Sequence, residues 1–244
     1  MSLATGLDHV GIAVHDLDAA AAEFEALGFQ VTPTAPHLPG GITGNRCVML
    51  GQGYLELLAV IDPAGRSATV EKFLARYQGI HVISLTTDDA EAAAKRLGQE
   101  VIRSERPTDQ GLARFARVAL TALTPRLQLI QHLTPDLVWR AQDCVHANGA
   151  QALTAVVMTA ENPATAAADL ARTAGRVLVP DPDGGFALRL GRGEIRVLDD
   201  IATIFPGLAV PSQPFVAGVV VTTNNIALVG QIRSAAGVAI RFAA

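Results

Sequence analysis

Residues 7–29 read LDHVGIAVHDLDAAAAEFEALGF, a short β-rich run followed by an alanine-rich run with helical spacing. The first eight residues predict a strand. Asp16 is a candidate N-cap, and Gly28 is well placed to end the helix. Between them, apolar residues recur on one helical face at Leu17, Ala20, Ala21, Phe24 and Leu27. The segment therefore predicts a strand that leads directly into an amphipathic helix.

Two more strand-like runs follow, RCVML (46–50) and YLELLAV (54–60), separated by a Gly-Gln-Gly hairpin signal at 51–53. Residues 7–60 therefore predict a βαβββ module. The same order starts again at IHVISLTT (80–87), with Asp88 or Asp89 as a cap and strand candidates to residue 132. His9 aligns with His81, and YLEL (54–57) aligns with RLQL (126–129), both at an offset of 72 residues. This agreement indicates a duplicated unit over 7–60 and 80–132.

The C-terminal part predicts two weaker copies of the module. A strand at 152–159 precedes the helix-starting pair Asn162-Pro163, and Gly175 ends that helix. A shortened copy at 215–244 predicts a strand and then a helix over IALVGQIRSAA (226–236). We expect an α+β fold in which paired βαβββ modules form curved mixed sheets around a pocket. The expected domains are 5–140 and a degenerate pair at 150–244, joined by a connection at 133–151.

Composition excludes several classes of protein. The chain has 244 residues, half of them hydrophobic, and a net charge of -4 with no basic patch, which argues against nucleic-acid binding. It has neither an apolar run long enough for a transmembrane helix nor a signal-peptide pattern at its N-terminus. Cys47 and Cys144 are far apart, without metal-type spacing, and are expected to be structural thiols. These features predict a cytoplasmic protein.

Strand alternation places His9, Gly11 and Ala13 on one face of the first strand, where small neighbours leave room for a ligand. Glu56 lies among apolar residues of a core strand, and a glutamate there needs a partner. That partner could be a metal, or an arginine such as Arg46 or Arg117. Alternatively, burial could raise the pKa of Glu56 and make it a general acid or base.

LDHVGIAVHDLDAAAAEFEALGF, followed by YLEL and then IHV, resembles the vicinal-oxygen-chelate superfamily, and most closely its glyoxalase-like branch. His37, Gly41, Thr43 and Asn45 resemble a loop pattern of that branch. The resemblance covers residues 5–140 well and is faint beyond them. It implies a divalent metal held by the first and last strands of two modules.

Carried over by position, the implied ligands are His9, Glu56, His81 and Gln128. Gln128 departs from the commoner glutamate and is a poorer ligand, and His132 on the same strand could substitute. Two histidines and one carboxylate suit Fe, Mn, Ni or Zn. Asn45 could hydrogen-bond a substrate carbonyl or cap its loop. His37, in a Pro/Gly-rich loop, could contact substrate or be solvated.

Two main functions remain open from the sequence. One is a metal-dependent lyase, isomerase or dioxygenase that acts on a small oxygenated molecule, with Glu56 able to move a proton. The other is a metal-free protein that binds or sequesters a small molecule. A third, weaker interpretation is a structural or dimerisation module without a ligand. No nucleic-acid or membrane partner is expected, and a homodimer is plausible.

Overall fold

A computed structural model describes residues 2–37 and 40–244, and within these ranges it contains four α-helices and fifteen strands of one branched sheet. The first module consists of β1 (Gly6–Ala13), α1 (Leu17–Ala26), β2 (Ala35–Pro36), β3 (Thr43–Met49) and β4 (Tyr54–Val60). After α2 (Ala68–Leu74), the second module consists of β5 (Gly79–Thr86), α3 (Ala90–Leu97), β6 (Ile102–Thr108), β7 (Gly111–Leu120) and β8 (Arg126–His132).

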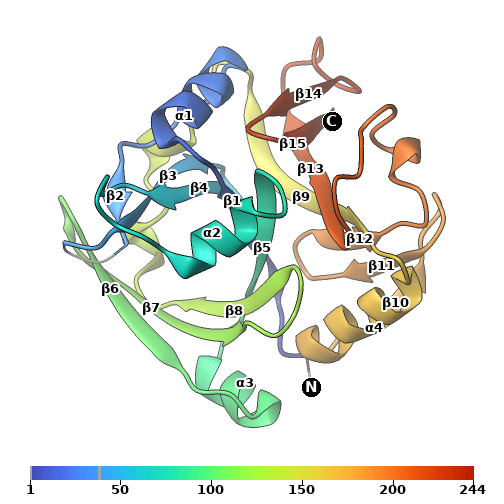
Figure 1. Cartoon of the computed structure of the whole chain (residues 1–244), viewed down its shortest axis with the longest axis horizontal. Coiled ribbons are helices and arrows are strands. Elements are labelled where there is room, and N and C mark those ends of the chain that lie inside the picture. The colour runs from blue at the N-terminus through green and yellow to red at the C-terminus, as the bar shows by residue number, and fades with distance from the viewer. Residues whose placement is uncertain (1, 38–39) are drawn as a thin grey trace.

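The C-terminal half repeats this plan beside the first (Figure 1). Its third module consists of β9 (Ala150–Thr159), α4 (Pro163–Ala174), β10 (Leu178–Pro180), β11 (Phe186–Arg189) and β12 (Glu194–Val197). The fourth consists of β13 (Phe215–Thr223), β14 (Ile232–Ala235) and β15 (Val238–Ala243). Short 3-10 turns at Pro135–Leu137 and Ala141–Cys144 lie in the connection between the halves.

Strand pairing shows that the halves share one topology. In the first half, β1 and β5 pair antiparallel, β1 also pairs parallel with β4, and β5 pairs parallel with β8. In the second half, β9 and β13 pair antiparallel, and they pair parallel with β12 and β15. The two halves join where Val216 pairs with Ile80 and where Gln52 forms an isolated bridge with Ala152. The predicted α+β class, with two sets of paired modules, is confirmed.

Helix ends follow the signals read from the sequence. Asp16 accepts hydrogen bonds from the backbone N–H groups of Asp18 and Ala19, and Asn162 accepts one from Thr165. Asp89 caps α3 in the same way. Gly98 ends that helix with a φ of 63°, in the left-handed region that favours glycine. These local interactions set where the helices begin and end.

The helix expected over 226–236 is not formed, which corrects that prediction. Residues 232–235 are instead strand β14, which pairs antiparallel with β15. The turn between them is Ala236-Gly237, and both residues have positive φ, 50° and 78°. Two positive φ values suit a tight hairpin turn and stop a helix. The hydrophobic run in this segment therefore serves a hairpin.

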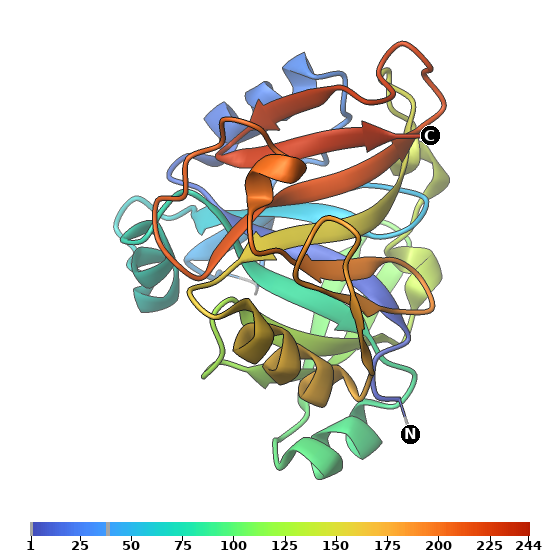
Figure 2. The same ribbon diagram turned by 90° about the vertical axis from the view of Figure 1, so that its right-hand side faces the viewer.

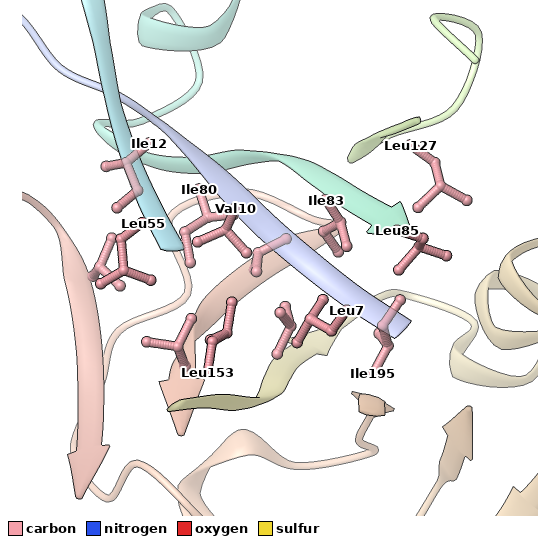
Figure 3. Close-up of a cluster of buried hydrophobic side chains, with 14 of the residues drawn as sticks. Leu7, Val10, Ile12, Leu55, Ile80, Ile83, Leu85, Leu127, Leu153 and Ile195 are labelled. Atoms are coloured by element: carbon pink, nitrogen blue, oxygen red, sulfur yellow. The ribbon is translucent and has the colours of Figure 1, made fainter. Parts of the chain in front are cut away.

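One face of β1 packs into a hydrophobic core between the two halves. Figure 3 shows Leu7, Val10 and Ile12 of β1 among side chains from β5, β9 and β12, including Leu153 and Ile195. Figure 2 shows the strands of the C-terminal half in front of those of the first half. With one face of β1 in this core, the opposite face, which carries His9, is left to line a cavity. Among the described residues, no helix has the length and apolar character needed to cross a membrane.

Candidate functional site

The larger cavity lies between the two N-terminal modules and has a volume of about 810 Å³. Strands of both modules line it, and α2 contributes Val70 and Phe73 from one side. Its polar wall includes His9, Asn45, Glu56 and Gln128. Four of the residues singled out in the sequence therefore meet at one hollow of the size that small-molecule sites occupy.

Glu56 is held as a carboxylate at this wall, with 15% of its side chain exposed. Asn45 donates a hydrogen bond to its Oε1, and His37 Nε2 lies 3.5 Å from the same oxygen. Burial raises the pKa of Glu56, but the hydrogen bonds of His37 and Asn45 and the charge of His9 outweigh it and lower the pKa to about 2. The alternative of a raised pKa is thus corrected.

Arg46, one of the two arginine partners considered for Glu56, pairs instead with Asp18 and Glu25. His37 is positioned by a contact of 3.0 Å between its Nδ1 and Thr43 Oγ1. The loop histidine and Asn45 therefore both face the carboxylate from β3 and the segment before it. This is the arrangement expected of residues that meet a ligand together with Glu56.

His9 is buried beside Glu56, with its Nε2 3.7 Å from Glu56 Oε2. Its Nδ1 lies 2.7 Å from Asp8 Oδ1. Ser84 Oγ lies 2.8 Å from His9 Nε2, and Gln128 Nε2 lies 3.3 Å from the same atom. Because Gln128 donates to Ser84 Oγ at 2.5 Å, the serine hydroxyl is free to donate to His9. This network assigns the proton of neutral His9 to Nδ1, which donates to Asp8, and leaves Nε2 as the acceptor.

His81 does not join this cluster, which corrects the expectation that His9, Glu56 and His81 converge. Its Nε2 donates to the carbonyl of Tyr77 at 2.8 Å, and its ring stacks between Phe73 and Tyr77. Burial lowers the pKa of His81 to about 4, so the ring is neutral at pH 7. It packs under α2 and has no contact with Glu56.

The reason lies in the register of β1 with β5. The register passes from Leu7–Leu85 to His9–Ser84 and from Gly11–Val82 to Ile12–Ile80, so it skips Asp8 on one strand and His81 on the other. The same pairing is obtained when β1 and β5 exchange places, so each position of one strand has a counterpart on the other. Asp8 is the counterpart of His81, and His9 is the counterpart of Val82. An alignment offset of 72 residues is therefore wrong by one here, and one residue changes where a strand side chain points.

The metal ligand set implied by the resemblance does not assemble. Of the four implied ligands, His9, Glu56 and Gln128 line the cavity and supply one imidazole, one carboxylate and one amide. The position equivalent to His9 is Val82, which has no donor atom, and His37 near Glu56 lies outside the implied set. Within residues 2–37 and 40–244, no three His, Cys, Asp or Glu side chains are arranged to hold a metal ion. Fe, Mn, Ni and Zn sites need more imidazole or anionic donors than this. These residues do not fit such a metal.

His132 lies at a second hollow of about 400 Å³, on the other side of Asp8 from His9. Its Nε2 is 3.1 Å from Asp8 Oδ2, and its buried Nδ1 has no hydrogen-bond partner. Trp139 packs edge-on against its ring. The structure thus places His132 in contact with Asp8 and outside the wall of the larger cavity, whereas the sequence predicts substrate contact.

Three residues of the site were missed from the sequence: Asp8, Ser84 and Tyr54. Asp8 orients His9, Ser84 is its cross-strand neighbour, and Tyr54 stacks on the His9 ring at 4.3 Å. Burial raises the pKa of Tyr54 well above its usual value, so its hydroxyl stays protonated. Asp8 was missed because neighbouring side chains in a regular strand point to opposite faces, so a contact between Asp8 and His9 was not expected. Tyr54 could have been found, since it shares a face with Glu56.

Comparison of the sequence with known proteins identifies a family and a curated relative. A family model described as a glyoxalase-like domain matches residues 7–174. The curated human protein methylmalonyl-CoA epimerase, mitochondrial (Homo sapiens), is 39% identical over 101 residues, which cover 40% of this chain and 55% of the human protein. The chain therefore matches only about half the length of this curated relative.

Two solved structures share the fold across nearly the whole chain. A hypothetical protein from Staphylococcus aureus has a TM-score of 0.74 at 17% identity, covering 97% of this chain and 98% of its own. A mutant of 4-hydroxymandelate synthase from Streptomyces coelicolor has a TM-score of 0.57 at 16% identity, covering 92% of this chain and 72% of its own. These likenesses extend the shared architecture to the C-terminal modules.

Proposed function

The chain belongs to the glyoxalase-like family of the vicinal-oxygen-chelate superfamily, and from that premise we propose that it is an enzyme that moves a proton on carbon in a small oxygenated molecule. The reaction would be that of an isomerase, an epimerase or a lyase. One observation carries the proposal: a buried imidazole, oriented by Asp8, lies 3.7 Å from the Glu56 carboxylate at the wall of an 810 Å³ cavity.

In the proposed reaction, His9 is the base. When a substrate binds, the Ser84 hydroxyl turns away from Nε2, which then takes a proton from a carbon next to a carbonyl group. The C–H electron pair passes to the carbonyl oxygen, and the proton later returns to carbon. Asp8 at Nδ1 and Glu56 near Nε2 stabilise the imidazolium from both sides. With a pKa of about 2, Glu56 is a weaker base than an imidazole, which favours His9 for this role.

The amides of Asn45 and Gln128 are the proposed donors to the oxyanion that forms on the carbonyl oxygen. Both amides lie at the cavity wall, on β3 and β8, so they approach a bound molecule from different modules. Since the donor set does not fit a transition metal, no step of this proposal runs through one. The metal-dependent version expected from the resemblance is replaced by hydrogen-bond donors.

Hydrogen exchange tests the proposal directly. Candidate carbon acids are incubated with the protein in ²H₂O, beginning with methylmalonyl-CoA because the human relative is named an epimerase of that compound. Small 2-oxo and 2-hydroxy acids follow. We expect deuterium to enter at the carbon next to the carbonyl with wild-type protein and not with His9→Gln. His15→Gln, at an exposed position before α1, is the matched control. Equal exchange by wild type and His9→Gln would overturn the assignment.

A second candidate function is binding or sequestration without turnover. Two observations favour it. Val82 and Gln128 occupy positions where metal-binding side chains would complete a catalytic metal site, and Glu56 already accepts a hydrogen bond from Asn45. In that case a ligand would bind in the cavity, and no carbon acid would exchange its hydrogen. Tight binding of a compound that the protein leaves unchanged would support this function over the first.

A further inference from the structure

Three arginines on neighbouring strands line the larger cavity. They are Arg106 on β6, Arg117 on β7 and Arg126 on β8. Among the residues that the structure describes, none of the three forms an ion pair. The second module therefore brings three positive charges to the wall that faces His9 and Glu56.

The other charged groups on this side of the cavity are paired with one another. Arg140 contacts Asp109 at 2.9 Å and Asp143 at 2.7 Å. Glu105 contacts Arg114 at 3.0 Å. The acidic residues near the three cavity arginines are thus already neutralised. The remaining charge is positive, which is the field that attracts a small anion into a cavity.

Arg126 is the most constrained of the three. Its Nε is buried and has no hydrogen-bond partner, and its guanidinium carbon lies 5.3 Å from the centre of the Phe73 ring. Arg117, on the neighbouring strand β7, lines the same cavity, and burial and the charge of Arg117 both lower the pKa of Arg126. A buried N–H without an acceptor is costly, and an oxyanion between two arginines would satisfy it.

The distance along β8 connects this arginine to the reacting groups. Arg126 and Gln128 are two residues apart on the cavity face, which corresponds to roughly 7 Å. Gln128 Nε2 in turn is 3.3 Å from His9 Nε2. A molecule of a few carbon atoms spans that distance, with a charged group at one end and the reacting carbon at the other.

We infer that the cavity binds a small organic anion whose carboxylate or phosphate group is held by Arg126 and Arg117. The position of its reacting carbon beside His9 rests on the proposed function, whereas binding of the anion does not. Arg106, further along the same wall, adds to the attraction without being required for the contact.

The test is a titration of the full chain with inorganic phosphate and, separately, with succinate at low chloride, followed by backbone NMR shifts. We expect saturable binding that weakens at least roughly tenfold in Arg126→Gln and in Arg117→Gln. Arg103→Gln is the matched control, since Arg103 is exposed on β6 and pairs with Glu91, and neither residue lines the cavity; its affinity should equal that of wild type. Arg126→Lys keeps the charge and guards against a folding defect in the glutamine variant.

Succinate binding more tightly identifies a carboxylate ligand, and phosphate binding more tightly identifies a phosphate ligand. Absence of saturable binding in wild type, or equal affinity in wild type and both glutamine variants, would overturn the inference. His9→Gln should bind either anion as wild type does. If wild-type protein binds anions but no carbon acid exchanges its hydrogen, the proposed reaction fails while the anion site stands. If carbon acids exchange hydrogen but neither anion binds, the anion site fails while the proposed reaction stands.

Discussion

His9 Nδ1 lies 2.7 Å from Oδ1 of Asp8, the residue immediately before it in β1. In a regular strand these two side chains would point to opposite faces. The pairing of β1 with β5 skips Asp8, and the irregularity brings its carboxylate alongside the imidazole. His132 and Thr86 hold the other oxygen of Asp8, so the carboxylate is fixed from three directions.

Asp8→Asn should leave the fold intact and remove the orienting charge. We expect the proton-transfer rate to fall by at least roughly 100-fold, because the carboxylate that orients the catalytic imidazole and stabilises its charged form is lost. ¹⁵N shifts of the His9 ring check the cause, since the Nδ1–H form should give way to a mixture of tautomers. Asp18→Asn, at an exposed carboxylate on α1, is the control. An unchanged rate and unchanged ring shifts would contradict the role of Asp8.

Val82→His combined with Gln128→Glu should create a metal site. The register makes Val82 the counterpart of His9, so the double variant adds one imidazole and one carboxylate to His9 and Glu56. We expect Zn²⁺ or Ni²⁺ to bind the tag-free double variant at least roughly 100-fold more tightly than wild type. Calorimetric titration measures this difference. If the wild-type protein bound one metal ion tightly and Glu56→Gln did not, the side chains already present would be enough to bind a metal.

The free energy of unfolding should fall as the pH drops from about 4.5 to about 2, in part because of Glu56. Its pKa is lowered in the folded chain, to about 2 from 4.5, so its contribution is complete above pH 4.5 and is lost as the folded form is protonated. A shift of this size corresponds to about 3 kcal/mol. Urea titrations at several pH values should show a shallower fall for Glu56→Gln. Identical slopes in wild type and variant would count against the buried carboxylate.

His81 should make stability depend on pH in a different window. Its pKa is lowered to about 4 from 6.5, so the unfolded chain takes up the proton first and stability falls between pH 6.5 and about 4. The slope is at most about 1.4 kcal/mol per pH unit for one group. His81→Gln keeps a donor for the Tyr77 carbonyl and should flatten the slope. His15→Gln, at an exposed site, should leave it unchanged.

Leu153→Ala should destabilise the whole chain in a single transition. Leu153 is fully buried in the core where β9 packs against β1 (Figure 3), so the cavity left behind weakens both halves together. We expect a loss of about 2–5 kcal/mol. Calorimetry and circular dichroism should report one midpoint. Leu133→Ala, nearly half exposed, should cost far less. Two separate transitions would mean that the halves unfold independently.

Local signals in the sequence determined the module order, the helix ends and the face of the first strand that lines the cavity. Asp16, Asn162 and Gly98 act within a few residues of themselves, so their roles do not depend on distant partners. Strand alternation predicted that His9 faces the pocket, and the resemblance implied His37, Asn45 and Glu56; the structure places all four at one cavity.

Only the tertiary structure decided which residues complete that site. Asp8, Ser84 and Val82, not His81, are the partners and counterparts of His9, because the register between β1 and β5 departs from regular pairing at two positions. A register is a relation between two strands far apart in the chain, and an error of one residue redirects a side chain. Residues 232–243 form a hairpin for the same kind of reason, because the pairing of β15 with β13 outweighed the helical pattern of the local sequence.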